Sequence, residues 1–336
     1  MKVDGGIAGG LDGAAASAAE QEAQGYDGVW SAETSHDPFL PLLLAAQSTT
    51  RVDLATGIAV AFARNPMTLA QTAWDLQTAS HGRFVLGLGS QIKPHITRRF
   101  SMPWSHPASR MREMVLAIRA IWDCWTDGSK LDFRGDFYTH TLMTPFFDPG
   151  PNAFGHPRVF LAGVGEKMTE VAGEVTDGFI CHGFTTERYM REVTVPALER
   201  GRAAAGRSMD GFELYGPMFV VTGRDEDEMA TAATAVRRQI AFYGSTPAYR
   251  PVLELHGWGD LQDELNRLSK EGRWAEMGDL VDDDMLTTFA VVAGLDDVAD
   301  RLADRWGGLL QRVGFYAPYD IDRVRWGEVI ATLKAA

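Results

Sequence analysis

The sequence has few cysteines, no long apolar run and no excess of basic residues. Its two cysteines, Cys124 and Cys181, form no CxxC pair, so we expect a reduced protein of the cytoplasm without a disulfide framework. No segment approaches the ~18 consecutive apolar residues of a membrane span, and the first residues carry no apolar signal-like run. A net charge of -13 argues against a nucleic-acid partner, which would require a basic face. The composition therefore predicts a globular protein with neither a membrane nor a nucleic-acid partner.

Common catalytic motifs are missing as well. The chain has no Ser-His-Asp order typical of hydrolases, no Walker lysine, no GxGxxG fingerprint and no HExxH pair. The acidic runs "RDEDE" and Asp282–Asp284 lack the spacing of a metal cage, and we interpret them as solvated helix caps. We therefore expect no metal site.

Short apolar strands alternate with amphipathic helices along most of the chain. This rhythm predicts parallel strands joined by right-handed crossovers, and eight such units favour an α/β fold of the (β/α)8 TIM-barrel type. Residues 1–336 are expected to form a single domain, with insertions at about 130–157 after strand four and about 245–286 before strand eight. The eight predicted strands are 2–7, 28–32, 53–60, 83–90, 158–164, 178–183, 212–221 and 312–318.

The third strand does not end where a strand should. In "TGIAVAFARNP", Thr56 to Pro66, the apolar run passes the expected turn and meets its first charge only at Arg64. A regular buried strand followed by an irregular loop is one interpretation. The other is an apolar shelf at the barrel mouth, where the active sites of TIM barrels lie.

Other candidate residues follow from the strand ends. Glu33 and His36 come after strand two, and "GLGSQIKPH" after strand four contains Ser90, Gln91 and His95. They could also be ordinary loop residues, and His95 lies in a loop rich in Trp and Pro. The turn "AGVGEKM" after strand five is a stronger signal, because small residues before a helix leave backbone N–H groups free to bind an anion. A shelf with an anion-binding turn suits a flat aromatic cofactor with a phosphate tail.

As a set, several segments resemble the luciferase-like monooxygenase superfamily, and within it the group of oxidoreductases that use the deazaflavin coenzyme F420. The resemblance covers nearly the whole chain. It is carried by "GYDGVWSAE", "TGIAVAFARNPMTLA", "SHGRFVLGLGS", "VFLAGVGEKMTEVAGEVTDGFI" and "FAVVAGLDDVADRL".

The resemblance implies roles for individual residues. A bulge at Gly57–Ile58, often a non-prolyl cis peptide in this family, would back the middle ring of the cofactor. Glu33 takes the place of an acidic residue near the cofactor. The residues that it assigns to cofactor binding are Gly57, Ile58, Ala59, Ser90, Gly163, Val164, Gly165, His182 and Gly183. Phe62, Gln91, His95 and Trp104 are expected to line a pocket for a substrate of apolar character.

The sequence also departs from the family pattern. Sugar-phosphate dehydrogenases of the group have a histidine after the strand-two acid, where this chain has Thr34. Their glutamate after strand four is replaced by Gln91 or Ile92. Sugar-phosphate oxidation is therefore not supported, and Glu33 and His36 remain as candidates for the catalytic groups, with His36 the candidate for proton transfer.

Three functions stay open at this point. The first is an oxidoreductase that moves a hydride between coenzyme F420 and a small organic molecule. The second is an FMN-dependent monooxygenase that relies on a separate reductase. The third is a binding protein that keeps the barrel but has lost its acid–base groups. The resemblance also implies a homodimer.

Overall fold

Eight parallel strands form a closed barrel at the centre of the computed structural model, which describes residues 1–8, 10–321 and 323–335. These strands are β1 (Lys2–Gly6), β2 (Gly28–Ser31), β3 (Asp53–Thr56), β5 (Phe84–Gly89), β8 (Arg158–Ala162), β9 (Gly178–Ile180), β10 (Glu213–Val221) and β12 (Arg312–Tyr316). Their order around the barrel is β1-β2-β3-β5-β8-β9-β10-β12, and β12 pairs with β1 to close it. The predicted TIM barrel is confirmed.

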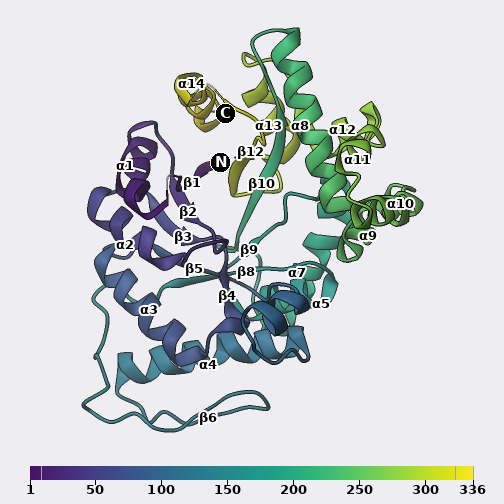
Figure 1. Ribbon diagram of the computed structural model, residues 1–336. Helices are drawn as coiled ribbons and strands as arrows, with labels where there is room; N and C mark the ends of the chain where they lie inside the picture. Colours follow the sequence, from purple (N-terminus) through teal and green to yellow (C-terminus); the bar gives the residue numbers. More distant parts are fainter. Residues whose placement is uncertain (9, 322, 336) are drawn as a thin grey trace.

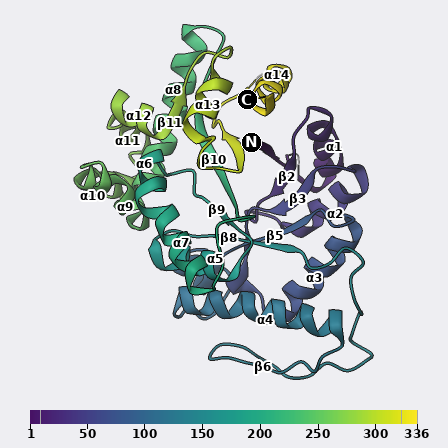
Figure 2. The same ribbon diagram turned by 180° about the vertical axis from the view of Figure 1, so that it is seen from behind.

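Helices surround the barrel on its outside (Figures 1 and 2). They are α1 (Gly10–Ala23), α2 (Phe39–Ser48), α3 (Pro66–Ala79), α4 (Pro107–Asp127), α5 (Glu166–Val175), α7 (Val195–Ala204), α8 (Glu226–Gly244), α13 (Val298–Trp306) and α14 (Arg323–Ala335). Their starts follow local rules. Asn65 caps α3 by accepting from the N–H of Thr68, with Pro66 in the first turn, and Asp225 caps α8 in the same way.

Two segments stand outside the ring. Residues 130–157 form an arm along the outer side of α4, with a short hairpin of β6 (Phe133–Arg134) and β7 (Thr139–His140) (Figure 1). The carboxylate of Glu113 on α4 holds this hairpin, because it accepts backbone N–H groups of Asp136, Phe137 and Tyr138. These short strands were not predicted from the sequence.

The segment before the last barrel strand is helical. It contains a 3-10 turn (Pro247–Tyr249), α9 (Arg250–Leu255), α10 (Gly259–Lys270), α11 (Trp274–Asp279) and α12 (Asp283–Phe289). A hydrophobic cluster separate from the main core joins these helices to α8 and to Phe184 and Phe219 of the barrel. The insertion therefore rests on the rim of the barrel near the ends of β9 and β10.

Strand β10 changes its neighbour halfway along. Its first residues, Glu213 to Tyr215, pair with β9, whereas Phe219 to Val221 pair with β11 (Ala290–Val292), a strand that the sequence analysis did not predict. Pro217 lies between the two pairings. Proline cannot donate to a ladder, so it is tolerated in this strand where one side has no partner strand. The barrel is thus opened along one side at its upper end.

Charged side chains close the lower end of the barrel. Arg312, only 1 % exposed, donates to both carboxylate oxygens of Asp4 at 2.7 and 2.8 Å and to Asp53 at 2.6 Å. Arg158 bridges Asp53 and Glu213 at 2.7 and 2.9 Å. Asp4 also accepts from the indole of Trp30, which fills the barrel interior.

Candidate active site at the barrel mouth

The irregular end of the third barrel strand is a β-bulge. Ala55 pairs with Val85, and pairing resumes in β4 (Ala59–Val60), where Ala59 pairs with Leu88. Three residues therefore lie between the paired positions on this strand and two on β5, and the extra residue bends the strand. The peptide bond between Gly57 and Ile58 is cis, as the resemblance implies. A short 3-10 turn (Ala61–Ala63) follows and leads to α3.

Thr56 closes the gap that the bulge leaves in the ladder. Its hydroxyl donates to the carbonyl of Gly87 at 2.7 Å and accepts the N–H of Gly87 at 2.9 Å. A side chain at Gly87 is excluded, since a Cβ there would lie 1.8 Å from the carbonyl oxygen of Thr56. One buried threonine thus replaces the hydrogen bonds of a strand neighbour.

Ile58 lies on top of the side chains that fill the barrel. It is half-buried and packs against the interior cluster of Trp30, Ala55, Val85, Phe160, Ile180 and Tyr215. Gly57 allows this position because its Cα faces Trp30, where a Cβ would lie 2.8 Å from the indole ring. Gly89 gives Ile58 room in the same way. The exposed part of Ile58 is therefore an apolar platform at the end of β3, while Ala59 is buried.

Glu33 holds this platform in place. The backbone N–H of Glu33 donates to the carbonyl of Ile58, and its carboxylate accepts the N–H of Val60 at 2.7 Å. The same oxygen pairs with Arg64 at 2.6 Å, and Arg64 also pairs with Asp37. The Glu33 side chain is 6 % exposed. These contacts favour a positioning role for Glu33 over the catalytic role expected from the sequence. His36 lies exposed in the same loop.

The loop after β5 carries the other predicted pocket residues. Ser90 is half-buried, and Gln91 has a left-handed backbone with φ +59°, which is uncommon for a residue with a side chain. His95 is exposed at the start of a π-helical turn (His95–Arg99). Trp104 is half-buried and its ring meets Phe62 edge-on. Phe62 itself is fully buried below it, so the structure places Phe62 in the core and not on an open wall.

The predicted anion-binding turn lies at the start of α5. Gly165 precedes the helix with φ +82° and ψ 150°, a conformation that favours glycine, and no side chain caps the helix. The N–H groups of the first turn therefore lack intrahelical partners. Space is open at Gly165, where a Cβ would meet nothing within 4 Å. Val164 is exposed beside it, and Gly163 packs closely on Met168 and Phe179.

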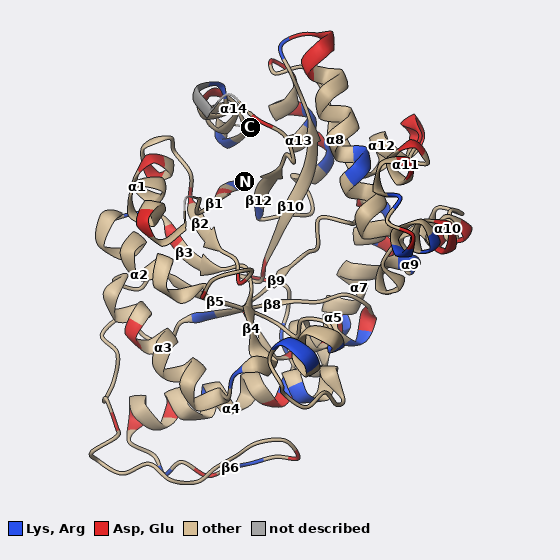
Figure 3. Cartoon of the chain, in the orientation of Figure 1, with Lys and Arg blue, Asp and Glu red and all other residues tan. Residues whose placement is uncertain are grey.

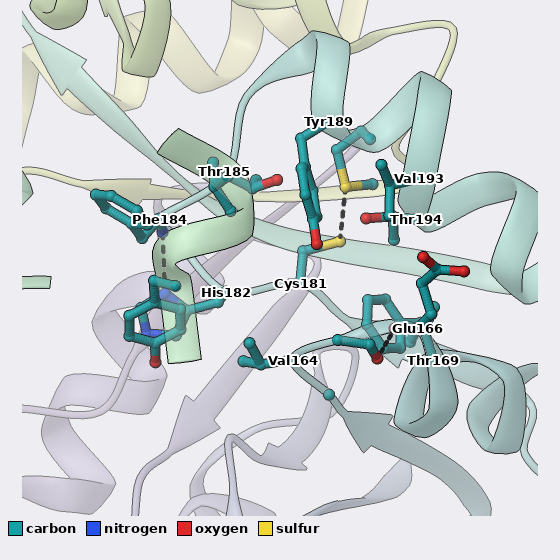
Figure 4. A pocket seen from close by; sticks show the side chains of 16 residues that line it. Val164, Glu166, Thr169, Cys181, His182, Phe184, Thr185, Tyr189, Val193 and Thr194 are labelled. Atoms are coloured by element: carbon teal, nitrogen blue, oxygen red, sulfur yellow. Dashed lines mark hydrogen bonds between the residues drawn. The ribbon is translucent and has the colours of Figure 1, made fainter. Parts of the chain in front are cut away.

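A pocket of about 440 Å³, part of it open to solvent, lies next to this turn (Figure 4). Its walls come from the turn itself, from residues after β9, from the helical segment after Thr186, and from the insertion. The lining side chains that the sequence analysis did not single out include Cys181, Thr185, Tyr189, Thr194, Tyr249 and Val252. Thr185 is buried, and among the described residues its hydroxyl has no hydrogen-bond partner.

The helical segment at this pocket contains a wide turn. After α6 (Glu187–Tyr189) the chain forms a π-helical turn (Met190–Thr194) and then continues as α7. Pro196, at the start of α7, has no N–H to donate, so it cannot make the regular helical bond to the carbonyl four residues before it. This proline is the signal in the sequence that could have pointed to the wide turn, which places Val193 and Thr194 at the pocket.

His182 is the titratable group most strongly affected here. Its ring stacks on Tyr249 with centroids 4.5 Å apart and meets the edge of Tyr243 at 4.6 Å. Burial lowers the pKa of His182 to about 4, so the imidazole is neutral near pH 7. Its Nδ1 accepts the N–H of Phe184 at 3.0 Å, which puts the proton on Nε2 (Figure 4). No acceptor for Nε2 occurs within the part of the chain that the structure describes.

The predicted residues therefore lie at neighbouring strand ends. Ile58 follows β3, Ser90 follows β5, the Gly163–Gly165 turn follows β8, and His182 follows β9; these strands are consecutive in the barrel. Gly183 lies against β10, where a Cβ would be 2.8 Å from the carbonyl of Pro217. His36 and His95 are exposed on the loops after β2 and β5.

Within the described ranges, no group of three or more His, Cys, Asp or Glu residues could hold a metal ion. None of the helices described is both long and apolar enough to cross a membrane. Cys181 lines the pocket, but burial raises the pKa of its thiol to about 12, so it is no thiolate near pH 7.

Comparison with known proteins agrees with this arrangement. The family model described as "luciferase-like monooxygenase" matches residues 3–311. An uncharacterized protein of Mycobacterium tuberculosis is 59 % identical over 313 residues, covering 93 % of this chain and 92 % of that protein. A 5,10-methylenetetrahydromethanopterin reductase of Archaeoglobus fulgidus is 27 % identical over 290 residues, which are 84 % of this chain and 82 % of the reductase.

Solved structures show the same fold. The coenzyme F420-dependent tetrahydromethanopterin reductase from Methanopyrus kandleri superposes with a TM-score of 0.78 at 20 % identity, covering 99 % of this chain and 96 % of the other. The EDTA monooxygenase from Chelativorans sp. BNC1 has a TM-score of 0.76 at 15 % identity, with 100 % and 93 % covered. Reductases and oxygenases are thus both similar in architecture.

Proposed function

The chain belongs to the luciferase-like monooxygenase family, and from that premise we propose that it is an oxidoreductase which uses coenzyme F420 to transfer a hydride to or from a small organic molecule. The observation that carries the proposal is the arc of groups at the barrel mouth. An apolar platform at Ile58 and an uncapped helix start at Gly165 lie at the ends of β3 and β8, with only β5 between them.

The residues present fit such a cofactor. Gly165 leaves open space at the helix N-terminus, where a phosphate is favoured by free N–H groups and the helix dipole. The unpartnered hydroxyl of Thr185 lies in the adjoining pocket. When bound, the deazaflavin would supply a carrier of two electrons as hydride.

Side chains of this protein would orient the cofactor ring and supply a proton to the substrate. Ile58, held by Glu33 and Arg64, would support one face of a ring, and Ser90 would lie beside it. The neutral Nε2–H of His182 offers a donor to a carbonyl or phosphate oxygen. We assign proton transfer to His36, an exposed imidazole that can both accept and donate a proton. The substrate would enter past Gln91, His95 and Trp104.

The choice of coenzyme F420 over FMN rests on the resemblance of "ARNP" to the deazaflavin group and on a 26 % identical protein of Mycobacterium tuberculosis that is named a putative coenzyme F420-dependent oxidoreductase. The alternative, an FMN-dependent monooxygenase, is supported by the family description and by the similarity to EDTA monooxygenase. A barrel that only binds ligands, without catalysis, is the third possibility.

Equilibrium titration with each cofactor separates these functions. We expect coenzyme F420 to bind at least ~10-fold more tightly than FMN, which corresponds to about 1.4 kcal/mol, and the reduced protein to consume little oxygen. Tight FMN binding with rapid oxygen uptake would establish the monooxygenase instead. Binding of a cofactor without turnover of any hydride donor or acceptor would favour the binding protein.

A matched pair of variants tests the phosphate position. Gly165→Val forces a β-branched residue into a left-handed conformation at the turn and should weaken binding of the phosphate-bearing cofactor. Gly206→Val is the control, because Gly206 also has a left-handed φ with open space around it but follows α7, outside the arc of strand ends. Equal cofactor affinities in the two variants would contradict the assignment.

A further inference from the structure

A long stretch of this acidic protein contains no acidic residue. Between Asp75 and Glu113 there is no Asp or Glu, although the chain as a whole carries a net charge of -13. The cations within it are Arg83, Lys93, Arg98, Arg99, Arg110 and Arg112. The middle of this stretch is the loop after β5, at the barrel mouth.

Three of these cations are already used within the fold. Arg83 donates to the carbonyls of Val52 and Thr49, and Arg112 pairs with Glu174. Arg110 is buried and donates to Tyr138 and to a backbone carbonyl. Their charges are therefore explained by the packing of helices and loops.

The other three are exposed and lack acidic partners. Lys93, Arg98 and Arg99 lie within seven residues of one another, and none forms an ion pair with any carboxylate that the structure describes. The π-helical turn His95–Arg99 is anchored by Ile96, which is fully buried. In Figure 3, where Lys and Arg are blue, a blue turn lies to the right of and below the label β4.

Arg99 holds the loop after β5 across the mouth of the barrel. Its guanidinium donates to the backbone carbonyl of Thr34, in the loop after β2, and lies 4.9 Å from the ring of Phe100. Because β3 lies between β2 and β5, this contact spans the end of β3, where Ile58 forms the platform. The cations thus lie on the loop after β5, the strand between β3 and β8, and Arg99 reaches past the end of β3 to the loop after β2.

Nearby carboxylates do not neutralise them. Glu33 and Asp37, on the loop that Arg99 touches, both pair with Arg64. Glu166, at the start of α5, pairs with Arg200. The loop therefore keeps a positive field at the mouth of an otherwise negative protein, and such a field attracts an anionic ligand.

We propose that Lys93, Arg98 and Arg99 form a binding site for carboxylate or phosphate groups of a molecule held over Ile58. The location of that molecule rests on the proposed function, whereas the charge of the loop does not. The anion has two possible sources: the anionic tail of the cofactor or an anionic substrate. In the second case the substrate is an organic acid or phosphate ester, and not the apolar molecule that the sequence suggested.

The test uses the full chain and two simple polyanions, inorganic pyrophosphate and citrate, titrated at low ionic strength. The variant K93Q/R98Q/R99Q removes the three charges. The double variant K93Q/R98Q keeps the contact between Arg99 and Thr34, so that loss of loop structure is separated from loss of charge. The control K130Q/R207Q/R301Q removes three exposed cations elsewhere that also have no ion pair among the described residues.

We expect the triple variant to bind the polyanions at least about tenfold more weakly, the double variant to fall between, and the control to match the wild type. Added salt should weaken binding by the wild type most. Equal affinity of wild type and triple variant would overturn the proposal, as would the failure of the wild type to bind either polyanion.

Titration of protein saturated with coenzyme F420 identifies the source. If the loaded protein no longer binds pyrophosphate, the cofactor tail occupies the loop. If it still binds pyrophosphate in a way that depends on Lys93 and Arg98, the loop serves the substrate. Failure of both coenzyme F420 and FMN to bind the wild type would reject the proposed function alone, since the response to polyanions can be measured without either.

Discussion

Among single residues, His182 shows how packing selects one form of a side chain. Tyr249 and Tyr243 cover its ring, and the N–H of Phe184 occupies Nδ1. Protonation would place a charge among aromatic rings and remove the acceptor for Phe184. The imidazole is therefore held in its neutral form, with Nε2 as the hydrogen-bond donor. As the pH falls, we expect the protein to lose stability before His182 becomes protonated in the folded state.

This has a measurable consequence for stability. Burial lowers the pKa of His182 to about 4, below the ordinary value of 6.5 for an unfolded chain. Between these values the unfolded state binds a proton that the folded state does not, so this contribution to stability is complete above pH 6.5 and is lost as the pH falls toward 4. From pH 7 to pH 5 the wild type should lose about 1–2 kcal/mol more than His182→Gln. Urea unfolding of both proteins at each pH measures this difference in unfolding free energy. Equal losses in the two proteins would show that the imidazole is not buried as described.

Some of the site residues could be predicted from the sequence and others could not. The glycines at 57, 163 and 165 and the acid at 33 could be identified because their types are tied to backbone geometry or to the family pattern. The pairing of Glu33 with Arg64 could not, since nothing in the spacing of the two residues shows that a loop and a helix start will meet. Thr185 and Tyr249 were missed for the same reason, as they come from segments far apart in the chain.

At the scale of elements, the bulge in the third strand depends on one side chain. The buried hydroxyl of Thr56 makes two hydrogen bonds to the backbone of Gly87, one to its carbonyl and one from its N–H. Without it the N–H and carbonyl of Gly87 would be left unsatisfied. The platform at Ile58 therefore depends on a residue that does not touch the mouth.

Thr56→Val keeps the shape of the side chain and removes the hydroxyl. We expect a loss of about 2–3 kcal/mol in the free energy of unfolding, because buried polar groups without partners carry their full desolvation cost. Thr56→Ser keeps the hydroxyl and should recover most of that loss. Denaturant unfolding compares the two, and a valine variant as stable as the serine variant would mean that the bulge holds without these bonds.

The elements that the sequence did not predict are short or irregular. Strand β11 has three residues, and it is a strand only because the upper part of β10 is free to pair with it. The β6–β7 hairpin is held by Glu113 from α4, a contact between distant parts of the chain. The eight barrel strands were predictable because each is an apolar run followed by a helix.

At the scale of the whole molecule, the charged lower end of the barrel joins its first and last strands. Arg312 on β12 is bound to Asp4 on β1 and to Asp53 on β3. Burial alone would raise the pKa of Asp53, but Arg158 and Arg312 outweigh it and hold this pKa below its usual value. The contribution of Asp53 to stability is thus present near neutral pH and is lost as the pH falls through its lowered pKa.

Arg312→Met should destabilise the protein by about 3–5 kcal/mol, because it leaves the carboxylate of Asp4 buried without its cation. Arg267→Met is the matched control: Arg267 pairs with Glu264 and Glu271 on an exposed helix face, where such pairs contribute about 0–1 kcal/mol. Thermal and urea unfolding measure both. A loss below about 1 kcal/mol for Arg312→Met would mean that water or another cation replaces the guanidinium.

Because β10 changes its neighbour along its length, the two ends of the barrel differ in how their strands are paired. Below Pro217, β10 pairs with β9 on one side and with β12 on the other; above it, β10 pairs with β11, and among the described residues β11 forms no ladder with β9. The pocket crosses this seam, with Gly163 and Cys181 on one side and Tyr249 and Val252 on the other. If the gap between β9 and β11 widened, side-chain contacts would separate, but no backbone hydrogen bonds between these two strands would break. We therefore expect a wider ligand to be accommodated on this side of the rim, away from Ile58 at the end of β3.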